Sequence, residues 1–138
     1  MEALYSPKVI FWDFDGVIKE SVEVKTQGFV ELFKPFGGEI AGRVRAHHEE
    51  NGGMSRFEKL PLYLEWVGIE PTEDTISTYC AQLGQLTLRG VIASPWVPGV
   101  EDYLRKNKCH QKFVIVSATP QDELNQIIQA LELQECFT

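Results

Sequence analysis

The sequence predicts an α/β fold, a partial Rossmann-like parallel sheet core with an inserted all-helical cap. Two short apolar runs, Val9–Trp12 and Phe113–Val116, are typical of strands that are buried on both faces of a parallel sheet. About a hundred residues separate these runs, which is far more than a simple crossover connection needs. The segment between them has helical patterning, so we expect a long helical insertion.

The expected boundaries assign residues 1–20 and 95–138 to the core and residues 21–94 to the cap. The segment Pro95–Gly99, which contains two prolines and a glycine, marks the return of the chain from the cap to the core. With 138 residues and 43% hydrophobic content, the chain is large enough for an ordinary hydrophobic core.

Two aspartates, Asp13 and Asp15, follow the first strand directly, and Gly16 comes next. In an open parallel sheet, ligands bind at the carboxyl ends of the strands. Two carboxylates that meet there repel each other unless a cation or a proton neutralises them, so the pair is a candidate magnesium and nucleophile site. The alternative is a simple turn, because Asp and Gly are favoured in turns. A calcium-binding loop is excluded by the spacing of its acids and its glycine.

Helices are expected throughout the cap because apolar residues recur there at three- and four-residue spacing. The glycine pairs Gly37-Gly38 and Gly52-Gly53 are expected to end the first two helices. Capping residues mark where the next two begin. The helices are expected at Ser21–Phe36, at Glu39–Asn51, from Ser55 onward with a kink at Pro61, and from Pro71-Thr72 onward.

After the cap, a short helix is expected from Val100 to Asn107, before the second strand. That strand ends at Ser117, and Thr119 is expected to cap a further helix with Pro120 at its first position. The free amides at the start of a helix favour an anion, so Ser117 is a candidate phosphate ligand. Ser117 could instead only begin a turn.

The composition argues against several classes of partner. A formal net charge of −7 argues against a broad nucleic-acid-binding surface. No segment approaches the length of a transmembrane helix and no signal-peptide pattern is present, so we expect no membrane partner and a cytoplasmic location. Three widely spaced cysteines suggest buried hydrophobic side chains in a reducing compartment, not a disulfide framework or a zinc cluster.

The segment Asp13–Val17 after a buried strand, the helical insertion and the strand that ends at Ser117 together resemble the haloacid dehalogenase (HAD) superfamily, in its phosphoglycolate-phosphatase-like branch with a helical cap. The resemblance implies that Asp13 is the nucleophile and that Asp15 is the general acid and base. It also implies that Mg²⁺ is held by the Asp13 carboxylate and the backbone carbonyl of Asp15. Ser117 and the amide of Ala118 would bind the phosphoryl oxygens.

Members of this superfamily also carry a lysine on a later helix and a final acidic motif, and the resemblance implies a chain truncated before both. Lys112 is a poor substitute for that lysine because it precedes the second strand. We expect a C-terminally incomplete core whose open sheet edge and apolar surface favour a homodimer.

In the cap, Arg56 is the best candidate to bind a second anionic group of a substrate, because its planar guanidinium suits carboxylate or phosphate. The alternative is an ordinary charge at the end of a surface helix. Lys19 lies close in sequence to Asp13 and could contribute positive charge, although a solvated loop lysine is the simpler interpretation. His47 and His48 are adjacent on a helix, which disfavours joint metal binding.

Two functions follow as hypotheses. The first is a Mg²⁺-dependent phosphatase that acts on a small phosphorylated metabolite through an aspartyl-phosphate intermediate. The second is a catalytically impaired protein of the same fold that serves as a binding or assembly module. A signalling receiver domain is disfavoured, because its sheet has no helical insertion of this size.

Overall fold

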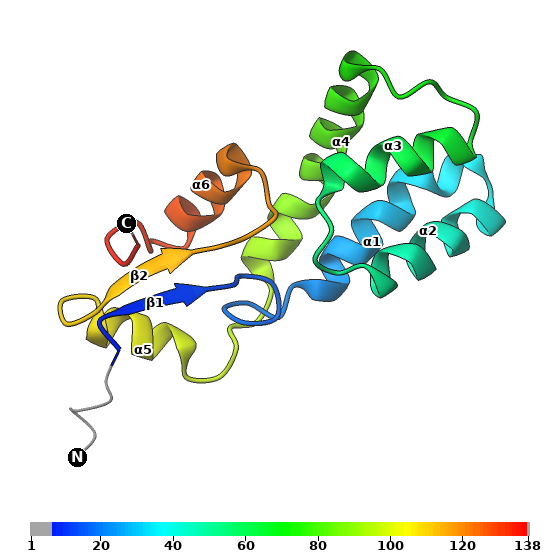
Figure 1. Ribbon diagram of the computed structural model, residues 1–138. Helices are drawn as coiled ribbons and strands as arrows, with labels where there is room; N and C mark the ends of the chain where they lie inside the picture. The colour runs from blue at the N-terminus through cyan, green and yellow to red at the C-terminus, as the bar shows by residue number, and fades with distance from the viewer. Residues whose placement is uncertain (1–6, 138) are drawn as a thin grey trace.

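The computed structural model describes residues 7–137, so the outermost residues of the predicted core, 1–6 and 138, lie outside the described residues. A small parallel sheet with its own helices lies beside a cap made of helices (Figure 1). The predicted α/β class with a helical cap is confirmed. The elements are β1 Val9–Trp12, α1 Val22–Phe33, the 3₁₀ helix η2 Lys34–Phe36, α2 Gly38–Glu50, α3 Arg56–Trp66, α4 Glu73–Ala93, α5 Val100–Asn107, β2 Lys112–Ile115 and α6 Gln121–Ala130.

The two strands pair in parallel, with Val9 opposite Lys112 and Trp12 opposite Ile115. β2 therefore begins and ends one residue earlier than the sequence predicts. Both strands run toward the cap, so the loops after β1 and β2 face the cap helices (Figure 1). On the other side of β2, Phe113 forms a parallel bridge with Phe137, where the next core strand is expected to begin.

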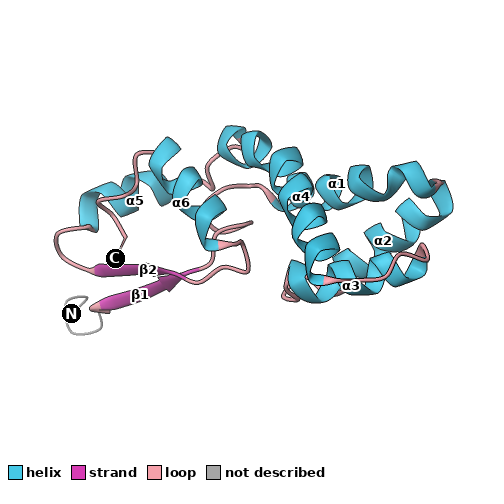
Figure 2. Ribbon diagram, turned by 90° about the horizontal axis from the view of Figure 1, so that it is seen from above, coloured by secondary structure: helices cyan, strands magenta, loops and turns pink. Residues whose placement is uncertain are grey.

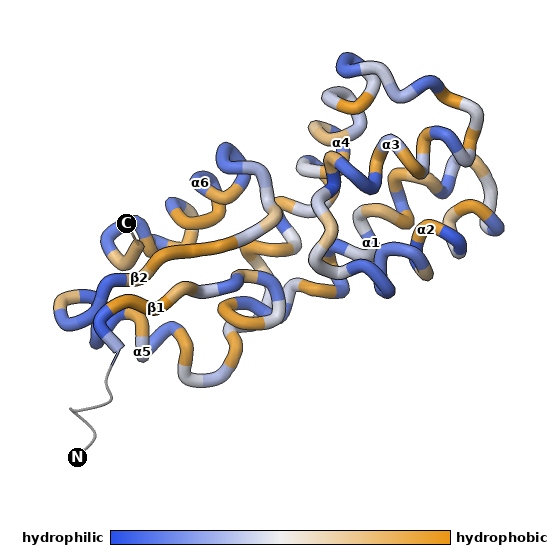
Figure 3. Tube along the Cα trace, in the orientation of Figure 1, coloured by the Kyte–Doolittle hydropathy of each residue, from blue (hydrophilic) through white to orange (hydrophobic). Residues whose placement is uncertain are grey.

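The prediction that both faces of the strands are buried is wrong. Phe11 is 69% exposed and Val116 is 59% exposed, whereas Phe113 is fully buried. Figure 2 shows the reason, because α5 and α6 lie on the same side of the two strands. Apolar residues nevertheless run along the strands (Figure 3). The homodimer stays a prediction, and this apolar face is the surface that it would cover.

Two separate hydrophobic clusters support the core and the cap, and α4 contributes to both. Val91 packs in the cluster beneath the sheet with Phe14 and Leu104. Leu83, two turns earlier in α4, packs in the cap cluster with Tyr63. Since one continuous helix carries both contacts, α4 connects the cap to the core.

Close packing between α1 and α4 depends on residues without side chains. A Cβ atom at Gly28 would overlap Cγ2 of Thr87, and one at Gly90 would lie 2.7 Å from Cγ1 of Val24. Real Cβ atoms do not approach other atoms so closely. The two glycines therefore let α1 lie directly against α4.

Several local expectations are modified by the structure. Thr119 does not cap α6, because Pro120 occupies the N-cap position and the Thr119 hydroxyl bonds elsewhere. Ser55 and Thr72 do cap α3 and α4, since their side chains accept hydrogen bonds from the N–H groups of Phe57 and Thr75. Cys80 and Cys136 are buried as expected, but Cys109 is exposed.

No helix between residues 7 and 137 combines the length and the apolar character that a membrane span requires.

We expect Gly28→Ala to lower the free energy of unfolding by about 1–3 kcal/mol, because overpacking a tight helix contact forces side chains or backbone to move. The matched control is Gly42→Ala in α2, where an added Cβ meets nothing within 4 Å. At that exposed helical position, alanine should stabilise the protein by about 0.5–1 kcal/mol. Urea denaturation of both variants tests the pair, and equal effects of the same sign would contradict the packing account.

Candidate active site

Asp13 and Asp15 lie in the loop that follows β1, at the end of the strand nearest the cap. Gly16 has a φ of +80°, a backbone conformation that glycine adopts without strain, and it turns the chain away from the strand. Asp13 is exposed, and its Oδ1 accepts a 2.7 Å hydrogen bond from the N–H of Phe14. Among residues 7–137, no group donates a hydrogen bond to its other carboxylate oxygen.

The Asp15 carboxylate is held by the start of α1. The hydroxyl of Ser21 donates a 2.5 Å hydrogen bond to its Oδ1, and Nζ of Lys25 lies 3.5 Å from its Oδ2. Because Ser21 and Lys25 are four residues apart, they project from the same face of the helix. Asp15 is therefore paired with a cation from the cap.

Ser117 and Thr119 form the matching loop after β2. The N–H of Thr119 donates to Oγ of Ser117 at 3.1 Å, and the two hydroxyl oxygens are also 3.1 Å apart. Nζ of Lys25 donates a 2.8 Å hydrogen bond to Oγ1 of Thr119. Parallel pairing of β1 and β2 brings this loop beside the aspartates, as expected for neighbouring strand ends.

Lys25 is a site residue that sequence reasoning missed. Its side chain is only 13% exposed, and it joins Asp15 to Thr119, a residue 94 positions away in the sequence. Burial lowers the pKa of Lys25, while the Asp15 carboxylate acts in the opposite direction. The four-residue spacing between Ser21 and Lys25 indicates that both lie on one face of a helix. Only the tertiary structure shows that this face meets Asp15.

Arg56 is buried, so the alternative of an ordinary surface charge is wrong. Its Nη1 lies 2.7 Å from Oε1 of Glu123 on α6. This ion pair joins the first turn of α3 in the cap to the first turn of α6 in the core. The guanidinium lines the cavity with its charge already compensated by a carboxylate.

Lys19 is not a solvated loop lysine. It is 3% exposed, and its ammonium lies 4.4 Å from the centre of the Trp96 ring, where a cation–π contact stabilises it. Burial lowers its pKa. Lys19 does not line the cavity described below, so the structure separates it from the other candidate substrate-binding residues.

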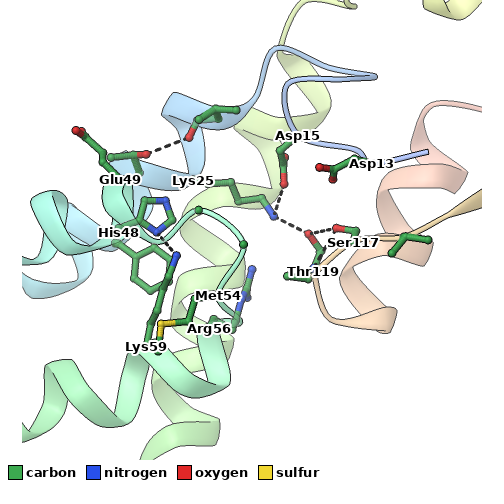
Figure 4. A pocket seen from close by; sticks show the side chains of 17 residues that line it. Asp13, Asp15, Lys25, His48, Glu49, Met54, Arg56, Lys59, Ser117 and Thr119 are labelled. Carbon is green, nitrogen blue, oxygen red and sulfur yellow. Dashed lines mark hydrogen bonds and ion pairs between the residues drawn. The ribbon is translucent and has the colours of Figure 1, made fainter. Parts of the chain in front are cut away.

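A cavity of about 580 Å³ lies between the strand ends and the cap (Figure 4). Its size suits a metabolite-sized ligand. It is lined by five segments: the loop after β1, the loop after β2, α1, the end of α2 with the Gly52-Gly53 loop, and the start of α3. The predicted residues among its lining are Asp13, Asp15, Arg56, Ser117 and Ala118, and the structure adds Val22, Lys25, Thr26, Phe29, His48, Glu49, Gly52, Gly53, Met54, Lys59, Val116 and Thr119.

Two cap residues, His48 and Lys59, form a contact at the cap side of this cavity. Nζ of Lys59 lies 2.9 Å from Nδ1 of His48, and the same ammonium is 5.7 Å from the centre of the Phe29 ring. Burial, followed by the charge of Lys59, lowers the pKa of His48 from 6.5 to about 4. His48 is therefore neutral at physiological pH and serves as an acceptor for Lys59.

The donors at the strand ends fit a magnesium ion only in part. The free oxygen of the Asp13 carboxylate and the Asp15 backbone carbonyl are hard oxygen donors of the kind that Mg²⁺ prefers. Within residues 7–137, no group of three or more His, Cys, Asp or Glu side chains could hold a metal ion. A Mg²⁺ ion often uses only one or two carboxylates and completes its shell with water, so this donor set is sufficient for a weak site.

Neither a protein-family model nor a curated protein sequence matches the chain. Solved structures do match. The β-phosphoglucomutase of Clostridium difficile is 21% identical, with a TM-score of 0.70, over 96% of this chain and 60% of that one. A predicted phosphoglycolate phosphatase from Haemophilus somnus is 16% identical, with a TM-score of 0.61, over 96% and 60% of the two chains. The L-2-haloacid dehalogenase of Xanthobacter autotrophicus is 18% identical, with a TM-score of 0.52, over 96% and 55%.

The fold implied by the sequence resemblance is thus confirmed, because 96% of the chain aligns with each of these three structures. The chain spans about 60% of the length of the first solved structures it matches. These neighbours are a mutase, a phosphatase and a dehalogenase by their descriptions, so the fold does not by itself select a reaction.

The lowered pKa of His48 predicts a pH-dependent stability. In the unfolded chain His48 takes up a proton near pH 6.5, whereas in the folded protein it stays neutral until about pH 4. The free energy of unfolding should therefore fall as the pH is lowered through this interval, with a slope below about 1.4 kcal/mol per pH unit, the limit for one proton. We expect a shallower fall for His48→Gln, which keeps an acceptor for Lys59 but does not titrate. Urea denaturation between pH 7 and pH 4.5 measures both slopes, and identical slopes would show that His48 does not cause the effect.

Proposed function

We propose that this chain carries the nucleophile, the general acid and base, and the phosphate-binding residues of a Mg²⁺-dependent phosphohydrolase for a small phosphorylated metabolite. The observation that carries this proposal is that Asp13, Asp15 and Ser117, predicted from separate parts of the sequence, line one cavity. The fold shared with phosphoryl-transfer proteins such as a β-phosphoglucomutase supports it.

In the proposed reaction, the free oxygen of Asp13 attacks phosphorus, and an oxygen–phosphorus bond to the carboxylate forms while the bond to the leaving oxygen breaks. Asp15 donates a proton to that leaving oxygen, and the alcohol departs. Asp15 then accepts a proton from water while the water oxygen attacks phosphorus. The bond between phosphorus and the Asp13 carboxylate breaks, inorganic phosphate leaves, and Asp13 is regenerated. Because Oδ1 of Asp13 already accepts a hydrogen bond from Phe14, the other oxygen is the available nucleophile.

Ser117 and Ala118 are proposed to bind the phosphoryl oxygens. The Ser117 hydroxyl already lies within hydrogen-bond distance of Thr119, so its orientation is set before a ligand arrives. Asp13 and the carbonyl of Asp15 would hold Mg²⁺, which supplies positive charge to the phosphoryl oxygens when bound.

Lys25 adds a second source of positive charge to this proposal. Its ammonium lies between Asp15 and the Ser117–Thr119 loop, where negative charge develops on a transferring phosphoryl group. We propose that it contacts the phosphoryl oxygens when substrate is bound.

A second candidate function is a binding or assembly module with impaired catalysis. The observation in its favour is that the Asp15 carboxylate is already occupied by Ser21 and Lys25. Since both oxygens of this carboxylate are engaged, neither is free to exchange a proton with a leaving group or with water. This candidate accounts for ligand binding without turnover.

We expect Asp13→Asn to lower the rate of phosphate release from phosphomonoesters by at least about a thousandfold, because it removes the nucleophile. Release of inorganic phosphate from a panel of esters with Mg²⁺ is the measurement. Asp102→Asn is the matched control, since Asp102 is an exposed aspartate on α5 that is paired with Lys106. Unchanged turnover in Asp13→Asn would refute the phosphohydrolase. Tight binding of tungstate without any turnover in the unmodified chain would favour the binding module.

Replacing Lys25 by methionine should lower kcat by about a hundredfold to a thousandfold, as expected when one positioned electrostatic group is lost. It should also weaken the binding of tungstate, a phosphate mimic, in calorimetry. Lys34→Met is the control, because Lys34 is an exposed lysine that follows the last residue of α1 and does not line the cavity. If both lysine variants behave alike, Lys25 has no part in the site.

A further inference from the structure

Three cationic side chains from the cap line the cavity, and two of them already face a carboxylate. Lys25 is paired with Asp15, and Arg56 is paired with Glu123. The sequence points to Arg56 as the residue that binds a second anionic group, but its charge is compensated within the protein. The third cation, Lys59, is in a different situation.

Lys59 is 1% exposed, and within residues 7–137 no carboxylate lies within ion-pair distance of its ammonium. Its close polar neighbour is His48, an acceptor without charge. Glu49 also lines the cavity, but it lies 2.8 Å from Nε of Arg45. Burying an ammonium without an anionic partner is costly, and a bound anion would remove that cost.

The position of Lys59 defines which part of a ligand it could meet. Lys59 and His48 lie on the cap side of the cavity, across from Asp13 and Ser117, with Lys25 between (Figure 4). Apolar side chains such as Phe29 and Met54 line the same cavity. A ligand with a phosphoryl group at the strand ends could therefore place a short carbon skeleton against these side chains and a second acidic group at Lys59.

We propose that Lys59, supported by His48, binds a second acidic group of the substrate, so that the site selects phosphomonoesters that also carry a carboxylate or a second phosphoryl group. This inference rests on the phosphohydrolase proposed above, since it assigns the first phosphoryl group to Asp13 and Ser117. Both acidic groups offer the same chemistry to an ammonium, namely anionic oxygen acceptors.

The test measures binding, so that it does not depend on turnover. Three phosphonates of equal chain length serve as probes, because a carbon–phosphorus bond offers no leaving oxygen to protonate. Propylphosphonate has one acidic end, 3-phosphonopropionate adds a carboxylate, and propane-1,3-bisphosphonate adds a second phosphonate. Calorimetry with Mg²⁺ gives their affinities for the wild-type chain and for Lys59→Met, Lys59→Arg and Lys106→Met.

We expect at least one of the two diacids to bind the wild-type chain tenfold or more tightly than propylphosphonate, the range for a charge-assisted hydrogen bond at a buried site. The diacid that shows the preference identifies the second group. Lys59→Met should lose the preference without losing propylphosphonate, and Lys59→Arg should keep part of it. Lys106→Met, which changes an exposed lysine, should behave as wild type.

Each contrary outcome has a separate meaning. A wild-type chain that binds all three probes equally, or a preference that persists in Lys59→Met, overturns the Lys59 site while the phosphohydrolase stands. Failure of the wild-type chain to bind any of the probes overturns both proposals. If Lys59→Met does not fold, Lys59→Gln replaces it, because glutamine keeps a donor for His48 without the charge.

Discussion

Where α1 crosses α4, Gly28 lies against Thr87 and Gly90 lies against Val24, so the two helix backbones approach more closely than side chains would permit. α4 is anchored in both hydrophobic clusters, and α1 is fixed in turn by its contact with α4. The first turns of α1 lie over the carboxyl end of β1. This contact therefore helps to hold Lys25 of α1 beside Asp15, where it lines the cavity.

The charges around the cavity follow from the same arrangement. Buried cations are tolerated in proteins when an anion compensates them. The loop after β1 supplies Asp15 to Lys25, and α6 supplies Glu123 to Arg56. Both ion pairs connect the cap to the core, so they also help to hold the two parts together. Lys59 has no such partner among the described residues, and it faces the space where a ligand would lie. The cavity is thus cationic toward its cap side although the chain as a whole carries a net charge of −7.

Much of the local structure could be predicted from the sequence because it depends on near neighbours. Thr72 caps α4 through a hydrogen bond within one turn, and the helix Val100–Asn107 has the predicted bounds. The exposure of Phe11 could not be predicted, since an apolar run is the same whether one or both faces of the sheet are covered. The burial of Lys19 against Trp96 could not be predicted either, because the two residues are far apart in the sequence and come into contact only in the folded protein.

The sequence by itself determined the fold type and the residues at the strand ends. Asp13 and Ser117 follow continuous apolar runs, which are typical of strands in a parallel sheet, and parallel pairing of such strands places the loops after them together. Only the tertiary structure decided which cations meet these residues. Lys25, Arg56 and Lys59 are all charged helix residues in the sequence, but in the fold Lys25 meets Asp15, Arg56 meets Glu123, and Lys59 meets no carboxylate within residues 7–137. The reason is physical, because the free energy of a charged group depends on its burial and on the charges around it, and both are set by how the helices pack.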